Sequence, residues 1–334
     1  MTTPHPPGIG RREAMRRLST GAGATALAGT TGAAAGAACA PAEAPATDMG
    51  QRFRQMLAGD DPVICPGAFD VISARLIVEM GFESVLIGGS AGSAANLGLP
   101  DYGLASITEL IDVSARIADA VPVPVFADAD DGGGSPLAIA RAVRGFERGG
   151  LAAVMIEDHV QAKHIGEGGI LLETDAMADR VRAAADARKT GMMLVARCDA
   201  VSVGLSEQEA MDRGAAYVEA GADLLFFAGL PPERIGAVAG ASGAPAIASV
   251  HDTPVGTLKE NGVPLVLYAG QLLRLALGAM KQGLQDIHDG ATWPNYAERA
   301  LPGDEYQALI RSGDWRDAAR RYNLVDESGR QVRG

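Results

Sequence analysis

Acidic side chains gather at the ends of two short apolar runs of this sequence. Asp128 and Asp130 follow the run 123–127, and Glu157 follows the run 153–156. Alternate residues of a strand point the same way, so Asp128 and Asp130 are expected to face one centre. Converging carboxylates repel one another unless a cation lies between them, and Mg²⁺ prefers such oxygen ligands. The three acids therefore predict a magnesium site, with Mn²⁺ as the second candidate metal.

A basic residue ends the next apolar run, because Arg197 follows 193–196. A guanidinium can hold a carboxylate through two parallel hydrogen bonds. Beside a metal with open positions, it would suit a small 2-oxo or 2-hydroxy dicarboxylate. Mg²⁺ would then act as a Lewis acid that stabilises the enolate formed as a C–C bond breaks. The alternative for Arg197 is an ion pair with Asp199 or Glu157, and the residues alone leave it open.

Two further acids stand next to these residues, and we assign them a different role. Asp131 and Asp158 lie where a helix could begin, and Asp is a favoured N-cap residue. We therefore expect them to cap helices rather than to bind metal. The sequence has no Cys/His cluster with the spacing of a zinc site.

The elements that would position these residues repeat a single unit. Short apolar runs alternate with segments of helical periodicity, and several helices are followed by Gly. The strands are expected at 63–65, 84–87, 123–127, 153–156, 193–196, 224–227, 246–248 and 265–268. The helices are expected at 71–80, 107–120, 136–148, 174–189, 206–220, 232–239, 254–261 and 271–287.

Eight such units predict an α/β fold, a (β/α)₈ TIM barrel with an extra C-terminal helical segment. The rival is an open doubly wound sheet, but no dinucleotide fingerprint follows the first strand. In a barrel of this kind the active site lies at the carboxyl ends of the strands. We expect the barrel to span 46–290 and the helical extension 291–334.

The first part of the chain has the pattern of an export signal. Arginine pairs at 11–12 and 16–17 precede the uncharged, Ala/Gly-rich stretch 18–42. This pattern resembles a twin-arginine signal, so we assign 1–45 to a signal peptide and linker. The mature protein would be periplasmic or extracellular, or cytoplasmic if the signal does not function. Lipidation of Cys39 is a minor alternative.

Composition excludes two classes of partner. The chain has 334 residues and a net charge of −12, which argues against nucleic-acid binding because phosphate neutralisation needs clustered Lys and Arg. The weakly apolar 18–42 stretch makes stable membrane insertion doubtful. Three cysteines cannot form a disulfide scaffold.

Several motifs together resemble one known family. They are Pro66-Gly67-Ala68-Phe69-Asp70, Ser73-Ala74-Arg75-Leu76, Gly81-Phe82-Glu83, Leu99-Pro100-Asp101, Asp128-Ala129-Asp130, Ile156-Glu157-Asp158, Ala196-Arg197 and Glu219-Ala220-Gly221-Ala222-Asp223. Over about residues 52–287 their order and spacing resemble the isocitrate lyase / phosphoenolpyruvate mutase superfamily. The segment around Gly88-Gly89-Ser90 is most similar to the oxaloacetate decarboxylase branch.

The resemblance implies a set of site residues. Asp128, Asp130 and Glu157 would hold Mg²⁺, partly through water. Gly88, Gly89, Ser90 and Arg197 would bind the substrate carboxylate, and Asp101 would line the site as a catalytic acid. The resemblance also implies a homodimer or homotetramer, in which subunits usually exchange a helix. The implied activity is that of a lyase acting on a C–C bond of a small dicarboxylate.

Two departures from the family pattern bear on the reaction. Ile165 stands where isocitrate and methylisocitrate lyases carry their catalytic Cys, and the phosphonate mutases place Asn there. The run 131–134, Asp-Gly-Gly-Gly, lacks the aromatic residue usual in relatives, which removes a ring from the site. His251 after the seventh strand is our candidate for acid–base work, with His164 on the loop 158–172 as a second. That loop is expected to close as a lid.

Two other functions stay open at this stage. One is P–C bond chemistry on a phosphonate, as in phosphonopyruvate hydrolase or phosphoenolpyruvate mutase. The other is a catalytically degenerate barrel that only binds ligand.

Overall fold

The computed structural model describes residues 48–160, 162–165, 169–250, 252–326 and 328–332. The proposed signal segment, 1–45, and His251 therefore lie outside the described residues. Residues 47–334 form one compact unit. Among the described residues, no helix is both long enough and apolar enough to cross a bilayer.

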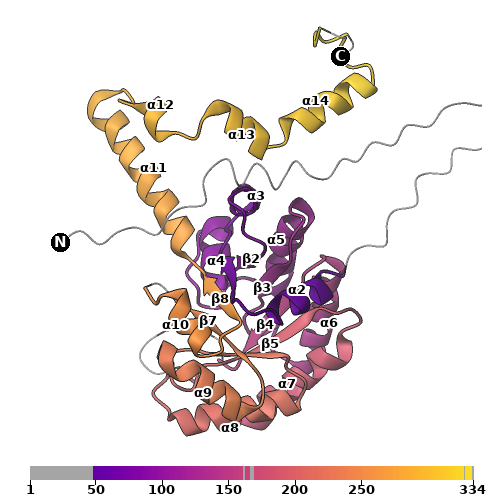
Figure 1. The fold of residues 1–334 in the computed structure, drawn as a ribbon, viewed down its shortest axis with the longest axis vertical. Coiled ribbons are helices and arrows are strands. Elements are labelled where there is room, and N and C mark those ends of the chain that lie inside the picture. Colours follow the sequence, from indigo (N-terminus) through magenta and orange to yellow (C-terminus); the bar gives the residue numbers. More distant parts are fainter. Residues whose placement is uncertain (1–47, 161, 166–168, 251, 327, 333–334) are drawn as a thin grey trace, which may run out of the picture. The chain divides into compact units, whose positions relative to one another are not determined.

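Within the described part of the chain, eight parallel strands form the central sheet, in the order β1-β8-β7-β6-β5-β4-β3-β2 (Figure 1). Their bounds are β1 Val63–Pro66, β2 Val85–Ile87, β3 Val125–Asp128, β4 Ala153–Glu157, β5 Met193–Cys198, β6 Leu224–Phe227, β7 Ala246–Ser249 and β8 Leu265–Tyr268. A parallel bridge between Gly67 and Leu86 joins β1 to β2 and closes the sheet into a barrel. The predicted (β/α)₈ fold is confirmed.

The helices follow the strands in the expected alternation. They are α2 Met49–Leu57, α3 Val71–Glu79, α4 Gly89–Leu97, α5 Ile107–Ala120, α6 Pro136–Arg148, α7 Thr174–Ala187, α8 Glu207–Glu219, α9 Pro232–Ser242, α10 Val255–Glu260, α11 Gln271–Gly290, α12 Tyr296–Arg299, α13 Gly303–Leu309 and α14 Ser312–Arg321. Local caps explain several starts: Ser106 forms a capping box with Glu109 at α5, and Ser135 caps α6.

Alternate residues of each strand enter two different cores. Leu86, Phe126 and Met155 belong to the cluster inside the barrel, whereas their neighbours Val125 and Val154 pack in the cluster with the surrounding helices. This alternation is the two-residue period of a strand. The inner positions therefore continue, at the carboxyl ends of the strands, into the side chains of the candidate site.

Two helices were not anticipated. Phe53 of α2 is fully buried in the cluster inside the barrel, so α2 packs against the barrel interior. Helix α4 begins at Gly89, directly after β2, in a Gly/Ser/Ala-rich stretch with little amphipathic pattern. Its first turn therefore lies at the carboxyl-terminal end of the barrel, beside the acids.

Candidate active site

Strand register brings the predicted acids and the arginine to one place. Asp128, Glu157 and Arg197 stand in the strands β3, β4 and β5, two residues beyond the inward-facing Phe126, Met155 and Val195.

The alternation that buries those three apolar residues turns the charged side chains toward the barrel axis. Glu157 and Arg197 are also register partners on adjacent strands. The sequence prediction that these residues converge is supported by this arrangement.

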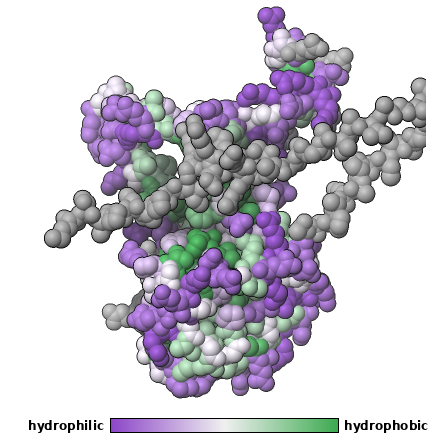
Figure 2. Space-filling model, in the orientation of Figure 1, coloured by the Kyte–Doolittle hydropathy of each residue, from purple (hydrophilic) through white to green (hydrophobic). Residues whose placement is uncertain are grey.

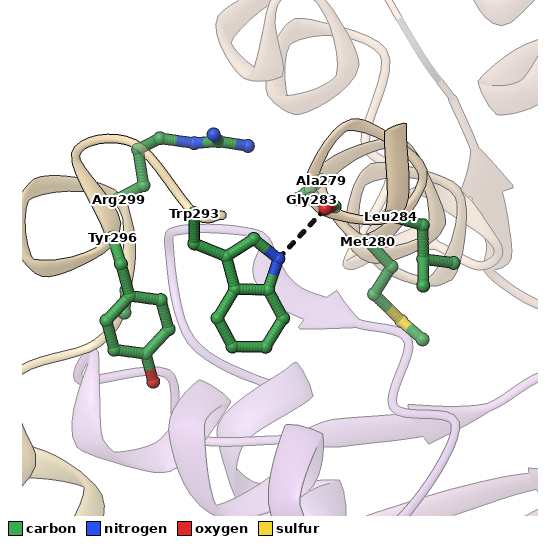
Figure 3. Close-up of a pocket in the computed structure, with 8 residues that line it drawn as sticks. Ala279, Met280, Gly283, Leu284, Trp293, Tyr296 and Arg299 are labelled. Carbon is green, nitrogen blue, oxygen red and sulfur yellow. Dashed lines mark hydrogen bonds between the residues drawn. The ribbon is translucent and has the colours of Figure 1, made fainter. Parts of the chain in front are cut away.

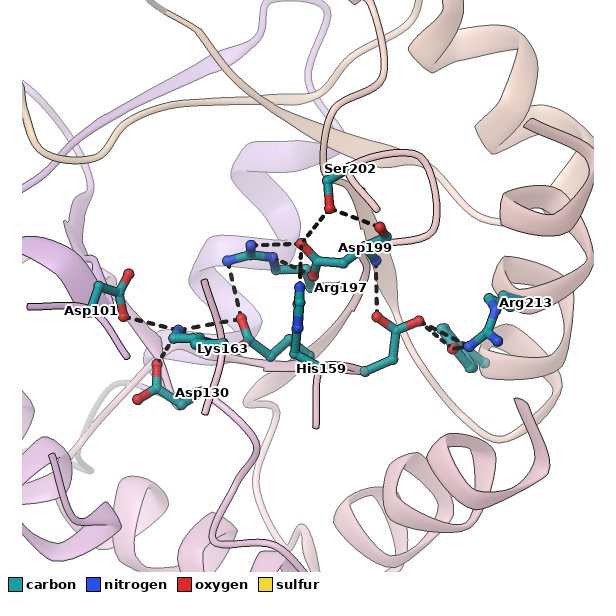
Figure 4. Close-up of polar contacts among 11 residues, drawn as sticks. Asp101, Asp130, His159, Lys163, Arg197, Asp199, Ser202 and Arg213 are labelled. Atoms are coloured by element: carbon teal, nitrogen blue, oxygen red, sulfur yellow. Dashed lines mark hydrogen bonds and ion pairs between the residues drawn. The ribbon is translucent and has the colours of Figure 1, made fainter. Parts of the chain in front are cut away.

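A lysine from the loop after β4 lies among the carboxylates (Figure 4). The Nζ atom of Lys163 is 2.6 Å from Asp130 Oδ1, 3.0 Å from Asp101 Oδ1 and 3.3 Å from Glu157 Oε1. The lysine side chain has no exposed surface. An ammonium group is stable in such a place only when charged partners surround it, as they do here. Sequence reasoning placed Lys163 on the lid but gave it no contact with the acids.

Arg197 makes the ion pairs that the sequence left as an alternative. Its Nε and Nη2 atoms donate to Asp199 Oδ2 and Oδ1 at 2.8 Å each, and Nη1 lies 3.1 Å from Glu157 Oε2. The guanidinium also lies 5.5 Å from the ring centre of Phe226. A guanidinium has five N–H donors, so these contacts hold the group and leave donors for a ligand.

The start of α4 borders the acids. The backbone N–H of Gly89 donates to Asp128 Oδ2 at 3.3 Å. A Cβ atom at Gly89 would lie 3.0 Å from Asp130 Oδ1, 3.1 Å from Asp128 Oδ2 and 3.3 Å from Asp101 Oδ1. Only glycine leaves these oxygens undisturbed. Gly88 is buried and Ser90 is exposed, so three of the four predicted carboxylate contacts, Gly88, Gly89 and Ser90, lie at one helix N-terminus.

Antiparallel contacts hold the base of the predicted lid. Val160 N donates to Ile170 O at 2.8 Å, and Leu172 N donates to Asp158 O at 2.8 Å. A bridge between His159 and Leu171 lies between these two hydrogen bonds. The described tip of the loop carries Lys163 inward, so the lid contributes a charged group to the site.

The second candidate histidine lies on this lid. His164 adopts a left-handed backbone conformation, with φ of 60°, and its ring meets that of His159 edge-on at 5.4 Å. Burial, followed by the positive charges of Arg197 and Lys163, lowers the pKa of His164. Ile165, at the position of the lyase Cys, is 60% exposed.

Burial and mutual repulsion shift the titration of the acids. Burial, with the nearby charge of Asp128, raises the pKa of Asp130 to about 6, although Lys163 acts in the opposite direction. Burial raises the pKa of Glu157 to about 8 against the opposing effects of Arg197 and Lys163. Burial alone would lower the pKa of Lys163, but the surrounding carboxylates raise it above its ordinary value. Such shifts are typical of functional sites.

The donor set has the chemistry of a divalent-cation site. Five carboxylates, of Asp101, Asp128, Asp130, Glu157 and Asp199, face the positive charges of Lys163 and Arg197. Among the described residues, the buried oxygen Asp130 Oδ2 has no hydrogen-bond partner, and Asp101 Oδ1 and Glu157 Oε1 are contacted by the Lys163 ammonium.

In the arrangement described, however, no group of three or more His, Cys, Asp or Glu side chains among the described residues could hold a metal. The charge and the oxygen ligands of this group fit a hard cation. For a cation to bind Asp130 and Glu157, Lys163 would have to move away from them.

The two acids predicted to cap helices do not cap them. Asp131 Oδ1 accepts from Gly133 N at 2.9 Å within its own loop, and Ser135 caps the helix instead. Asp158 is fully buried, where Oδ1 accepts from Asp199 N at 2.9 Å. Its Oδ2 accepts from Tyr217 Oη at 2.7 Å and from Arg213 Nη1 at 3.3 Å. Asp158 thus ties β4 to the loop after β5 and to α8, which the sequence pattern did not indicate.

Comparison with known proteins gives the family. The family model described as "Phosphoenolpyruvate phosphomutase" matches residues 53–288. A "Probable 2-methylisocitrate lyase 2" of Corynebacterium glutamicum is 34% identical over 292 residues, which cover 84% of this chain and 92% of that protein. The chain belongs to the PEP mutase/isocitrate lyase superfamily.

Other members of this superfamily carry different activities in their names. An "Oxaloacetate decarboxylase" of Rhodopseudomonas palustris is 32% identical over 288 residues, covering 84% of this chain and 96% of that protein. A solved structure of oxaloacetate acetylhydrolase with 3,3-difluorooxalacetate has a TM-score of 0.77 and 26% identity. The match covers 83% of this chain and 98% of the other. Members of the superfamily therefore differ in reaction and substrate.

Proposed function

We propose that this protein is a lyase that breaks a C–C bond of a small 2-oxo or 2-hydroxy dicarboxylate through an enolate. The observation that carries the proposal is the convergence of Asp128, Asp130 and Glu157 with Arg197 and Lys163 at the carboxyl end of a barrel. Relatives named probable 2-methylisocitrate lyase 2 and oxaloacetate decarboxylase align with this chain over most of their length.

The positive groups would bind the substrate carboxylates. Gly89 and Ser90 stand at the N-terminus of α4, where anions are stabilised, and the N–H of Gly89 donates to Asp128. Arg197 is held in position by Asp199 and Glu157 and would offer its remaining N–H donors. Asp101 would line the site beside Gly89 and contacts Lys163.

The acids would hold Mg²⁺, or Mn²⁺ in its place. Asp128, Asp130 and Glu157 are the proposed ligands, directly or through water, and the charge count of the site favours a divalent ion. When bound, the ion would supply Lewis-acid stabilisation of negative charge on the substrate's carbonyl or hydroxyl oxygen.

The lid favours one reaction within this class. Ile165 is exposed and cannot donate a proton, which removes the acid that isocitrate and methylisocitrate lyases use. Loss of CO₂ from a 2-oxo dicarboxylate needs no base. The C3–C4 bond breaks, its electron pair forms the enolate, and a proton from water then completes the 2-oxo acid. Lys163, delivered by the lid, would offset negative charge while the closed loop excludes bulk water.

A substrate panel tests the proposal. The purified chain, with Mg²⁺ or Mn²⁺, is assayed against oxaloacetate, 2-hydroxy dicarboxylates and phosphonopyruvate. We expect release of CO₂ or a 2-oxo acid, and loss of that activity in Asp130→Asn. The exposed Asp186 of α7 supplies the matched control, Asp186→Asn, which should retain activity. Phosphate release from phosphonopyruvate alone would favour P–C chemistry. Binding of oxalate with no turnover of any compound would favour a ligand-binding barrel.

We also propose that α11 contacts a second copy of the chain in a homodimer or homotetramer. None of its described residues is buried, and Leu275, Met280 and Leu284 are 69%, 60% and 63% exposed. Figure 2 shows apolar residues at the surface along this helix. Such an uncovered apolar face is typical of an interface.

The segment after α11 adds to this face. Trp293 stacks on Tyr296 with ring centres 5.2 Å apart and donates through Nε1 to Gly283 O at 2.9 Å (Figure 3). A pocket of about 340 Å³ lies between this pair and α11. Sedimentation should show a dimer or larger assembly that Leu284→Glu dissociates. The control Leu137→Glu, on an isolated side chain that is 85% exposed, should leave it intact.

Export through a twin-arginine signal stays a proposal. A reporter fused after residue 45 should leave the cytoplasm only when both arginine pairs of the first 17 residues are present. Cytoplasmic retention with both pairs intact would contradict it.

A further inference from the structure

Asp199, the first residue after β5, orients the guanidinium of Arg197 through a paired contact. Its Oδ2 and Oδ1 atoms accept from Nε and Nη2 of Arg197 at 2.8 Å each, so the plane of the carboxylate fixes the plane of the guanidinium. Asp199 is fully buried, and its Oδ1 also accepts from Ser202 Oγ at 3.2 Å. A shift of the backbone at Asp199 would therefore move the donors that Arg197 offers to a ligand.

Asp158 holds that backbone at two points. Its main-chain N donates to Arg197 O at 3.2 Å, and its side-chain Oδ1 accepts from Asp199 N at 2.9 Å. The two contacts lie on either side of Cys198, the last residue of β5. Asp158 is the first residue after β4, so its side chain extends the attachment of β4 to β5 one residue beyond the end of both strands.

Two side chains of α8 fix the other oxygen of Asp158. Oδ2 accepts from Tyr217 Oη at 2.7 Å and from Arg213 Nη1 at 3.3 Å. Asp158 and Tyr217 have no exposed surface, and Arg213 is 6% exposed. Arg213 is itself anchored, because Nε donates to Glu209 Oε1 at 2.9 Å and Nη1 donates to Leu172 O at 2.8 Å. We call Asp158, Arg213 and Tyr217 the Asp158 cluster.

We propose that the Asp158 cluster is a positioning device that holds Arg197, through Asp199, in the orientation in which Arg197 binds a ligand carboxylate. Figure 4 shows Arg213 and Arg197 on opposite sides of Asp199, so the cluster acts from behind the site and does not touch the ligand. A buried ion pair is weak evidence for stability, because well-packed apolar residues can often replace it without loss. The inference rests on the proposed function, in which Arg197 binds a carboxylate.

Oxalate binding reports on the orientation of Arg197 without requiring turnover. Calorimetry with Mg²⁺ present gives the dissociation constant of oxalate for the wild type and for Tyr217→Phe, which removes one hydrogen bond to Asp158. We expect Tyr217→Phe to bind oxalate about tenfold more weakly, because partners that orient a ligand-binding side chain commonly contribute that much. The matched control is Ser242→Ala, which removes a hydrogen bond of a 3% exposed hydroxyl to Met211 O of the same helix, α8, and should bind oxalate normally.

A double-mutant cycle with Arg197→Lys decides whether Tyr217 acts through Arg197. Lysine keeps the positive charge but cannot make the paired contact with Asp199. In that background Tyr217→Phe should weaken oxalate binding less than about twofold, because no guanidinium is left to misplace. Equal losses in both backgrounds, an unchanged affinity of Tyr217→Phe, or an equal loss in Ser242→Ala would each overturn the inference.

Two outcomes separate this inference from the proposed function. If no diacid is turned over but the oxalate affinities follow the expected pattern, only the proposed reaction is removed. If turnover is found but Tyr217→Phe binds oxalate normally, only the positioning role is removed. If Tyr217→Phe does not fold by circular dichroism, Arg213→Lys takes its place in the same cycle, because one nitrogen cannot replace both Nε at Glu209 and Nη1 at Asp158.

Discussion

Replacing Asp130 by Asn should change how stability depends on pH. Asp130 is 3% exposed, and its folded-state pKa is about 6 against an ordinary value of 3.8. Because the folded protein binds the extra proton, stability falls as pH rises from about 4 through 6. The difference of about 2.2 units corresponds to about 3 kcal/mol, fully lost above about pH 7.

The Asn variant isolates this effect because it keeps the shape of the site. Asp130 has φ of 49°, and Asn tolerates that left-handed conformation better than other replacements. The amide oxygen can still accept from Lys163. In metal-free protein, the variant should gain about 3 kcal/mol relative to the wild type between about pH 4 and about pH 7.

Urea unfolding followed by circular dichroism, in the presence of a chelator, measures this difference. At neutral pH, Mg²⁺ should raise the unfolding midpoint of the wild type and leave that of the variant unchanged, because the proposed ligand is gone. Identical pH slopes for the two proteins would refute the reasoning that Asp130 is forced to ionise in a buried, negatively charged site.

Three further substitutions test other contacts. Lys163→Met leaves buried carboxylates without their counterion and should destabilise the metal-free protein by about 3–5 kcal/mol, and Mg²⁺ should restore part of this stability. Thermal unfolding with and without metal measures the effect, and an unchanged melting temperature in the metal-free variant would contradict it. Tyr217→Phe removes the hydrogen bond to Asp158 and should cost about 1.5–3 kcal/mol in urea unfolding, whereas Tyr322→Phe, on an exposed ring, should cost nothing measurable. Gly89→Ala places a Cβ atom against three carboxylates and should weaken Mn²⁺ binding about tenfold or more by calorimetry. Gly92→Ala, whose Cβ meets only Ile87 at 3.8 Å, should bind Mn²⁺ normally, and equal affinities of the two variants would contradict the argument.

The sequence predicted most reliably those features that follow from the two-residue alternation of side chains along a strand. Every predicted strand overlaps an observed one, because buried parallel strands are continuous apolar runs. The predicted ends were one or two residues short at β3, β4 and β5, since the strands continue through Asp128, Glu157 and Arg197. Charged residues usually end a buried strand, but at a barrel mouth they extend it.

Contacts between distant segments were harder to predict. The position of Lys163 depends on how the lid folds back over the acids, and no local pattern encodes that. The role of Asp158 depends on Tyr217 and Arg213, which lie more than fifty residues away. Helix α4 was missed because its Gly/Ser/Ala sequence has little amphipathic period, and its start is fixed by the end of β2 instead.

The closure of the barrel has a consequence for its dynamics. Among the described strands, β1 and β2 meet through one bridge at Gly67 and Leu86, whereas β4 and β5 share five paired positions. A Cβ atom at Gly67 would lie 2.1 Å from Ala269 O, so the backbone there is pressed against the end of β8. The junction between β1 and β2 should therefore open before the other strand pairs of the barrel. In native-state hydrogen exchange, its amide hydrogens should exchange faster than those of the other described strand pairs. Since α4 begins three residues after Leu86, transient opening of this junction would momentarily release the N-terminus of α4 from Asp128, to which Gly89 N donates.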